Sequence, residues 1–197
     1  MIELNTGVLS RSRVERLDPA TIFGRVAPLQ VDLGCGDGLF LFQLAQLFPE
    51  KNFLGIERLV HRVAKAGRKA SKIDNMRVFR LETSYAVEHL LPPESVEAFY
   101  LSFPDPWPKR RHHRRRIFTK EFLNSIHRAL ERNGILRIAT DHLDYFQQIN
   151  KIALAEPGFA VANRKEIDLP QTRFETRFRA AGYPIYRLSL RSISPVT

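Results

Sequence analysis

The hydrophobic and polar residues of this chain follow two alternating patterns. Short apolar runs rich in β-branched and aromatic residues predict buried strands, and apolar residues at every third or fourth position predict helices. The predicted strands span residues 29–34, 52–57, 76–82, 95–103 and 134–141. The predicted helices span residues 38–48, 60–71, 85–91, 119–132 and 144–155. This alternation predicts an α/β fold with a mostly parallel sheet and helices on both of its faces.

The C-terminal part of the chain has a different pattern. Residues 159–166 and 184–192 are predicted as strands with no clear helix between them, and they are expected to pair in an antiparallel unit. With these two runs the sheet has seven strands and ends on an antiparallel strand. Asn133-Gly134 is predicted to cap the end of the helix over residues 119–132.

Composition narrows the class of protein. The chain has 197 residues, of which 44% are hydrophobic, so we expect a short arm over residues 1–28 and a single domain over residues 29–197. No apolar run approaches the about 20 residues that cross a bilayer, and the N-terminus lacks the apolar core of a signal peptide. Cys35 is the only cysteine, which excludes an internal disulfide and favours a cytoplasmic location. The net charge of +10 is clustered, which favours a nucleic-acid partner over simple solubility.

A glycine-rich segment, VDLGCGDGLF, follows the first predicted strand. Its glycines allow a tight turn and a close approach to a ligand, and they are Gly34, Gly36 and Gly38. A dinucleotide-binding loop would have its third glycine one residue later, so the spacing disfavours a nicotinamide dehydrogenase. Asp32 can hold an ammonium group, and Glu57, at the end of the second strand, can accept hydrogen bonds from both hydroxyls of a ribose. This combination suits S-adenosylmethionine.

The densest chemistry lies in SFPDPWPKRRHHRRR, residues 102–116. Three prolines fix the backbone on both sides of Asp105, so this corner is expected to be preorganised. Trp107 either stacks on a base or fills the local core. The basic run over residues 109–116 either binds phosphates or forms a solvated charged loop. His112 and His113 have no cysteine or histidine partners at metal-ligand spacing, so no metal is expected.

Five motifs together resemble the bacterial tRNA (guanine-N7-)-methyltransferases of the TrmB family. They are FPDPWPK followed by basic residues, DLGCGDG, GIE at 55–57, ATD at 139–141 and TRFE at 172–175. The resemblance extends from about residue 29 to about residue 192 and implies a Rossmann-like class I methyltransferase fold. It further implies S-adenosylmethionine as methyl donor, S-adenosylhomocysteine as product, and N7 of a guanosine in the tRNA variable loop (position 46 in the tRNA convention) as acceptor.

The resemblance assigns roles to positions of this chain. Donor binding falls to Asp32, Gly34, Gly36, Gly38, Glu57, Glu82 and Asp105, and Asp105 is also the catalytic residue. Substrate binding falls to Lys109, Asp141, Thr172, Arg173, Phe174 and Glu175. RNA binding falls to Arg110, Arg111, His112, His113, Arg114, Arg115 and Arg116. Two alternatives stay open: Glu82 as an exposed strand-end carboxylate, and T-x-x-E as a capping box that opens a helix.

The acceptor chemistry explains the absence of an obvious general base. Guanine N7 carries an in-plane lone pair and no proton, so the enzyme mainly has to align N7, the methyl carbon and the sulfur. Asp105 and Asp141 can accept hydrogen bonds from guanine N1–H and N2–H₂, and a carboxylate stabilises the positive charge that develops on the ring. We expect tRNA as partner, no obligate protein partner, and a monomer or homodimer. The alternatives are another base-directed RNA or DNA methyltransferase and a non-catalytic RNA-binding relative.

Overall fold

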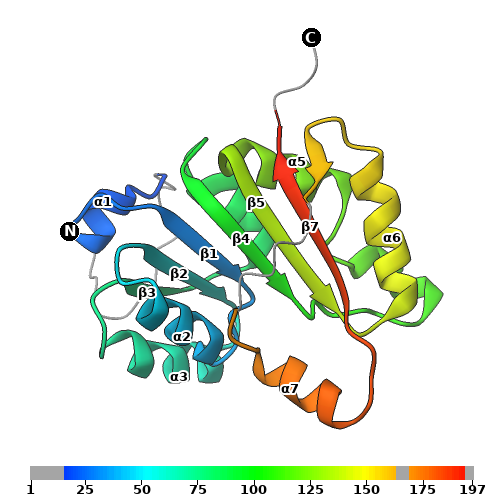
Figure 1. Ribbon diagram of the computed structural model, residues 1–197, viewed down its shortest axis with the longest axis horizontal. Helices are drawn as coiled ribbons and strands as arrows, with labels where there is room; N and C mark the ends of the chain where they lie inside the picture. The colour runs from blue at the N-terminus through cyan, green and yellow to red at the C-terminus, as the bar shows by residue number, and fades with distance from the viewer. Residues whose placement is uncertain (1–15, 163–168, 194–197) are drawn as a thin grey trace.

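A seven-stranded sheet in the order β3-β2-β1-β4-β5-β7-β6 runs through the molecule (Figure 1). The computed structural model describes residues 16–162 and 169–193. The strands are β1 (Leu29–Leu33), β2 (Asn52–Glu57), β3 (Met76–Arg80), β4 (Val96–Ser102), β5 (Leu130–Thr140), β6 (Phe159–Val161) and β7 (Tyr186–Ser192). The strands from β3 to β5 pair in parallel, and β7 runs antiparallel to both of its neighbours. The prediction of a mostly parallel sheet with an antiparallel last strand is therefore confirmed.

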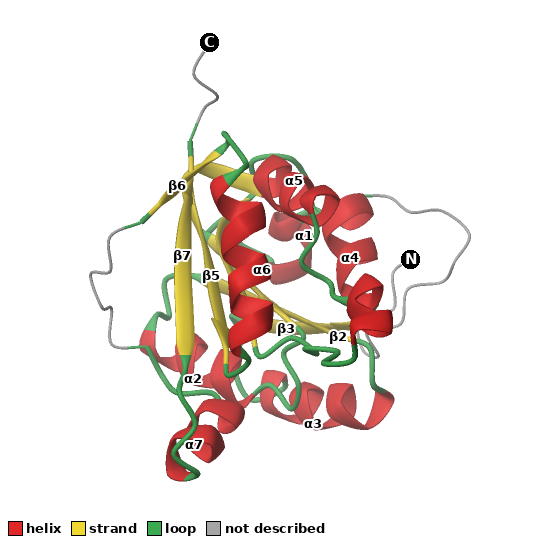
Figure 2. Ribbon diagram, turned by 90° about the vertical axis from the view of Figure 1, so that its right-hand side faces the viewer, coloured by secondary structure: helices red, strands yellow, loops and turns green. Residues whose placement is uncertain are grey.

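Helices pack on both faces of the sheet (Figure 2). They are α1 (Pro19–Phe23), α2 (Leu39–Leu47), α3 (Val60–Ala70), α4 (Thr83–Tyr85), the π-helical turn η1 (Ala86–Leu90), the 3₁₀ segment η2 (Arg110–Arg115), α5 (Lys120–Ala129), α6 (Leu143–Leu154) and α7 (Arg173–Ala180). One buried cluster joins the sheet to α1, η1, α5 and α6, and a second joins it to α2. In the described part of the chain, no helix has the length and apolar character needed to span a membrane.

The strands form where the sequence predicts them because their residues are buried on both faces. Every residue of β1 and β2 is buried, the polar Gln30, Asp32, Asn52 and Glu57 included, because both faces of a parallel sheet are covered. Part of the predicted arm also packs on the sheet: Leu17, Ile22 and Phe23 belong to the larger buried cluster. The bounds of arm and domain stay a prediction, since residues 1–15 lie outside the described residues.

Three predictions about local structure need correction. A helix, α7, lies between the last two strands, where none was expected. Helix α5 ends at Ala129, and Asn133 lies inside β5 in a left-handed conformation (φ 67°), next to an irregularity in the β4–β5 register. Asn133-Gly134 is thus no helix cap. The predicted strand over 159–166 is shorter, ending at Val161, and its residues 163–166 lie outside the described residues.

The topology places the informative loops at one edge of the sheet. The carboxyl ends of parallel strands meet there, and the strand order reverses between β1 and β4. Ligands of open α/β sheets bind at this position. Helix α7 lies beyond the same edge (Figure 1).

Candidate active site

The glycine-rich loop leaves β1 with its backbone open to a ligand. Gly34, Gly36 and Gly38 all have left-handed φ values, of 80°, 59° and 73°. A Cβ on Gly34 or Gly36 would meet nothing within 4 Å, whereas one on Gly38 would lie 2.8 Å from Cβ of Ala66 in α3. The amide of Gly34 donates to the carbonyl of Ile56, at 2.8 Å, which ties the loop to β2. The loop is therefore held by β2 and α3 on one side, and at Gly34 and Gly36 its backbone is open to a ligand.

Glu57, at the end of β2, is a buried carboxylate that organises this loop. It accepts hydrogen bonds from the backbone N–H groups of Gly36 (3.1 Å), Arg58 (2.8 Å) and Leu59 (2.9 Å). The guanidinium of Arg62 lies 3.8 Å from its second oxygen. A carboxylate has about four acceptor positions, so room remains for a ligand hydroxyl. This anchoring role was not visible in the sequence.

Asp32 lies in β1 directly before the loop and is also buried. Burial, and then repulsion from Glu57, raises its pKa to about 7. A cation placed beside Asp32 would offset both effects and restore its charge. This edge of the sheet thus combines the open backbone of the glycine loop with two carboxylates. The buried charge of Asp32 favours a nearby ammonium, and Glu57 has acceptor capacity left. This set of groups fits S-adenosylmethionine.

The proline corner after β4 is held in a constrained conformation. Phe103 and Trp107 flank it with left-handed φ values of 53° and 43°, which are rare for residues other than glycine. The amide of Phe103 donates to the carbonyl of Ala139 in β5, at 2.7 Å. Between them the Asp105 side chain is 73% exposed, and its carboxylate lies 4.0 Å from the guanidinium of Arg58. Because Arg58 follows Glu57, the corner and the donor side of the site are neighbours.

The basic run after the corner forms η2 and faces solvent for most of its length. Its exposed cations are Lys109, Arg110, Arg111, Arg114 and Arg115, while His112 and His113 are half-buried. The guanidinium of Arg115 lies 4.9 Å from the centre of the Trp107 ring, and the His112 ring meets the indole edge-on at 5.8 Å. Trp107 is therefore packed against the basic run, which leaves the question of base stacking open.

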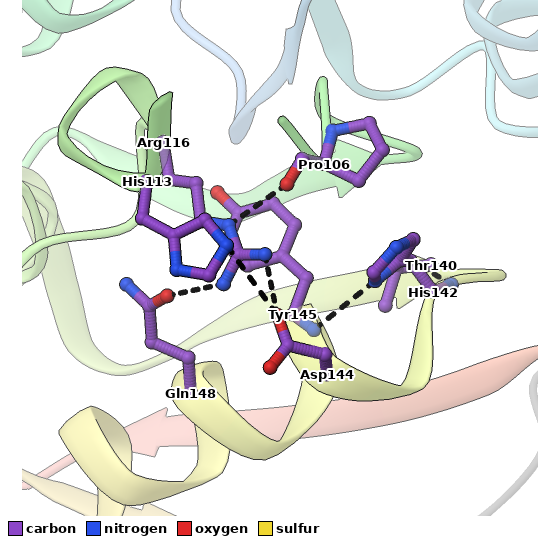
Figure 3. A network of polar contacts seen from close by, with 8 residues as sticks. All are labelled: Pro106, His113, Arg116, Thr140, His142, Asp144, Tyr145 and Gln148. Atoms are coloured by element: carbon purple, nitrogen blue, oxygen red, sulfur yellow. Dashed lines mark hydrogen bonds and ion pairs between the residues drawn. The ribbon is translucent and has the colours of Figure 1, made fainter. Parts of the chain in front are cut away.

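Arg116 is the exception, because its side chain points into the protein, and its predicted role in RNA binding remains untested. Its side chain is only 1% exposed and forms an ion pair with Asp144 of α6, at 2.5 Å (Figure 3). It also donates to the Gln148 side chain and to the carbonyl of Pro106. The hydrogen bond from Arg116 lowers the pKa of Asp144. All three nitrogens of this guanidinium therefore have partners inside the protein.

Two other predicted carboxylates lie in different surroundings. Asp141 directly follows β5, at the same edge as the corner, and is half-buried. Glu82 is exposed and caps α4 by accepting from the amide of Tyr85, at 2.8 Å. It lines a cavity of about 350 Å³ together with Arg114 and Arg115. The structure thus brings Glu82 to the basic run, and its predicted role in donor binding stays untested.

Helix α7 starts with Thr172 as its N-cap residue. The Thr172 hydroxyl accepts from the amide of Glu175, at 3.0 Å, so the T-x-x-E motif opens a helix with the first of the two bonds of a capping box. The Glu175 carboxylate is buried and forms ion pairs with Arg187 and, at 2.9 Å, with Arg179. Neither group is left without a partner, and the ion pair between Glu175 and Arg187 holds α7 to β7. Their contact with substrate remains a prediction.

The first turn of α7 contacts both halves of the site. The Arg173 guanidinium lies 3.2 Å from the carboxylate of Asp37 in the glycine loop, and the Lys69 ammonium donates to the Asp37 carbonyl, at 2.7 Å. The Phe174 ring lies 6.2 Å from that of Phe103 in the corner. Sequence reasoning did not single out Asp37, although its place between two loop glycines was a usable indication. Among the described residues, no group of His, Cys, Asp and Glu side chains is arranged to hold a metal ion.

Comparisons with known proteins agree with this arrangement. Residues 26–188 match a family model described as "Putative methyltransferase". The chain is 34% identical over 182 residues to a tRNA (guanine-N(7)-)-methyltransferase of Thermotoga maritima, covering 90% of this chain and 58% of that protein. It is 39% identical over 189 residues to one of Leifsonia xyli, covering 90% of this chain and 82% of that protein. A solved 16S rRNA methyltransferase, KamB, shares the fold with a TM-score of 0.66 at 15% identity, over 93% of this chain and 97% of that one.

Proposed function

The chain belongs to the tRNA (guanine-N7-)-methyltransferase family, and on this premise we propose that it methylates N7 of a guanosine in the variable loop of tRNA. The methyl group comes from S-adenosylmethionine, and the products are 7-methylguanosine and S-adenosylhomocysteine. The observation that carries the proposal is the position of Asp105, which lies on a constrained corner and contacts Arg58 beside the donor loop, at 4.0 Å.

The donor is held by the two buried carboxylates. Asp32 binds the ammonium of its methionine end, and Glu57 accepts from one ribose hydroxyl with the acceptor position that its three backbone N–H partners leave free. When bound, the donor supplies an electrophilic methyl group on a positively charged sulfur. Gly34 and Gly36 present bare backbone to it, because no side chain fills the space above them.

The base is positioned by carboxylates rather than activated by a general base. N7 is already a nucleophile, so the catalytic task is to hold guanine in line with the methyl–sulfur bond. Asp105 and Asp141, at the ends of β4 and β5, accept hydrogen bonds from guanine N1–H and N2–H₂. They also stabilise the positive charge that the imidazole ring gains. Adenine lacks the N2 amino group, which gives the site its selectivity.

The backbone of tRNA is bound by the exposed cations of the basic run. Lys109, Arg110, Arg111, Arg114 and Arg115 are exposed beside the corner, and Arg173 and Phe174 face it from α7. Phosphate contacts of this kind orient the substrate, and base contacts select it. We further propose that the protein needs no metal and no obligate protein partner, since methyl transfer to N7 requires neither an activated water nor a catalytic group from a second protein. It is proposed to work in the cytoplasm as a monomer or homodimer.

The test is methylation of an unmodified tRNA transcript. The protein is incubated with S-adenosylmethionine and transcript, the RNA is digested to nucleosides, and the product is identified by chromatography and mass spectrometry. A matched transcript carries adenosine in place of the variable-loop guanosine. We expect 7-methylguanosine with the first transcript and none with the second. Methylated adenosine would assign a different acceptor, and binding of donor and tRNA without any product would indicate a non-catalytic relative.

A further inference from the structure

One arginine of the basic run lies inside the protein. Arg116 ends the run, and its side chain is 1% exposed, in contrast to the solvent-facing Arg114 and Arg115. Nε donates to the Pro106 carbonyl at 2.8 Å, and the two terminal nitrogens donate to Gln148 at 2.6 Å and to Asp144 at 2.5 Å (Figure 3). One guanidinium therefore links the proline corner to helix α6.

The support beneath this guanidinium is rigid. It lies 4.8 Å from the centre of the Tyr145 ring, which is fully buried. The Tyr145 hydroxyl accepts from the amide of Phe118, at 3.1 Å, so the ring is fixed at its far end as well. Arginine stacks well on such a face because its guanidinium is planar and weakly hydrated.

The same network reaches the second carboxylate of the proposed base site. Asp141 lies between Thr140, whose hydroxyl accepts from the His142 amide at 3.2 Å, and His142, whose ring accepts from the Tyr145 amide at 3.4 Å. The two residues that flank Asp141 are thus bonded to each other, and one of them, His142, is bonded to the residue on which Arg116 stacks. Pro106, which Arg116 also binds, directly follows Asp105.

The corner needs such a support. The side chain of Asp105 contributes little to holding this residue in place, because it is 73% exposed and its carboxylate lies 4.0 Å from the guanidinium of Arg58. The residues that flank the corner, Phe103 and Trp107, adopt left-handed conformations that unsupported residues rarely keep. The bond from Arg116 to the Pro106 carbonyl fixes the backbone between them.

We propose that Arg116 is a positioning residue, which sets the spacing between Asp105 and Asp141 and so the plane in which guanine is held. The inference rests on the proposed methyl transfer and assigns to this arginine no contact with RNA. Its loss shifts the carboxylates without removing them, and a displacement of about 1 Å in a positioned site costs about a hundredfold in rate.

The test compares Arg116→Lys with Arg114→Lys and Arg114→Gln, which alter an exposed cation of the same run. Lysine keeps the charge but cannot donate to three partners in the fixed plane of a guanidinium. We expect Arg116→Lys to lower kcat about a hundredfold, with KM for tRNA within threefold and an unchanged Kd for S-adenosylmethionine. Arg114→Gln is expected to raise KM for tRNA with little change in kcat, and Arg114→Lys to have a smaller effect on both.

A spectroscopic readout separates positioning from loss of fold. Trp107 is the only tryptophan of the chain and lies in the corner, so its emission maximum and its quenching by acrylamide report corner geometry without substrate. Both should change in Arg116→Lys and stay constant in Arg114→Gln. Asp144→Asn is the second variant, because this side chain is 59% exposed and its replacement leaves the core intact. It should change Trp107 emission in the same direction and lower kcat about tenfold.

The outcomes are distinguishable. If Arg116→Lys keeps kcat, raises KM for tRNA and flattens its salt dependence, Arg116 is a phosphate contact and the inference is wrong. Unchanged Trp107 emission and kcat in a folded Asp144→Asn protein would also overturn it. If the wild-type protein forms no 7-methylguanosine, the proposed function fails, while a changed Trp107 emission in Arg116→Lys would still show that Arg116 sets the corner.

Discussion

The raised pKa of Asp32 predicts that donor affinity depends on pH. Burial and Glu57 raise this pKa to about 7, and only the ionised carboxylate attracts the donor ammonium. With a pKa of about 7, the ionised fraction is about three-quarters at pH 7.5 and about 3% at pH 5.5. The apparent Kd for S-adenosylmethionine should therefore rise about 25-fold over this range, which corresponds to about 1.9 kcal/mol.

Isothermal titration calorimetry measures this effect directly. Titrations between pH 5.5 and 7.5 avoid the range near pH 8, in which the amino group of the donor itself loses its proton. Repeating them in buffers of different ionisation enthalpy counts the protons released, and the number should approach one at pH 5.5. Asp32→Asn is the matched control: it should bind the donor weakly at every pH, with no dependence on pH in this range. A wild-type Kd that is constant over the range, or a pH dependence that survives in Asp32→Asn, would refute the assignment.

Three further predictions follow from the same site. The folded-state pKa of Asp32 lies above its unfolded value, so its contribution to the free energy of unfolding falls as pH rises from about 4 to about 7. Asp32→Asn should therefore be more stable than wild type at pH 8, by up to about 4 kcal/mol. A lower melting temperature of this variant would contradict the prediction. Asp105→Asn should lower kcat about a hundredfold with an unchanged melting temperature, since the side chain is exposed; near-normal turnover in single-turnover kinetics would exclude the role of Asp105 in positioning the base. Replacing Arg114 and Arg115 by Gln together should weaken tRNA binding and reduce the slope of log Kd against log salt by about 1.5, and filter binding that shows an unchanged slope would place the phosphates elsewhere.

The sheet was predictable from sequence because its strands are buried on both faces. Apolar and polar residues alternate along β1 (LQVDL), the centre of β2 (NFLGIE) is apolar, and the length of each run fits a strand rather than a helix. Helix α7 was not predictable in this way. Four of the eight residues in its sequence, RFETRFRA, are charged, only Glu175 is buried, and the apolar residues Phe174 and Phe178 are too few to indicate a helix. Its capping box was the only local indication.

The site was predictable where backbone geometry depends on residue type. Glycines at three left-handed positions and prolines at a constrained corner can be read from a sequence. Partners brought together by folding cannot. Nothing in a run of eight basic residues shows that Arg116 is the buried one, because that depends on Asp144 and Gln148 from a helix about thirty residues later. The approach of Arg58 to Asp105 is hidden for the same reason.

The central claim is methyl transfer to N7 of a single tRNA guanosine, and strand cleavage tests it most directly. Borohydride reduces the imidazole ring of 7-methylguanosine, the reduced base is then lost from its ribose, and aniline cleaves the RNA at the resulting abasic site. After incubation with protein and S-adenosylmethionine, an end-labelled tRNA transcript should be cut at one guanosine of the variable loop. Omitting the donor, or using Asp105→Asn, should abolish the cut or nearly so. Cleavage at other positions, or methyl incorporation without cleavage, would contradict the account.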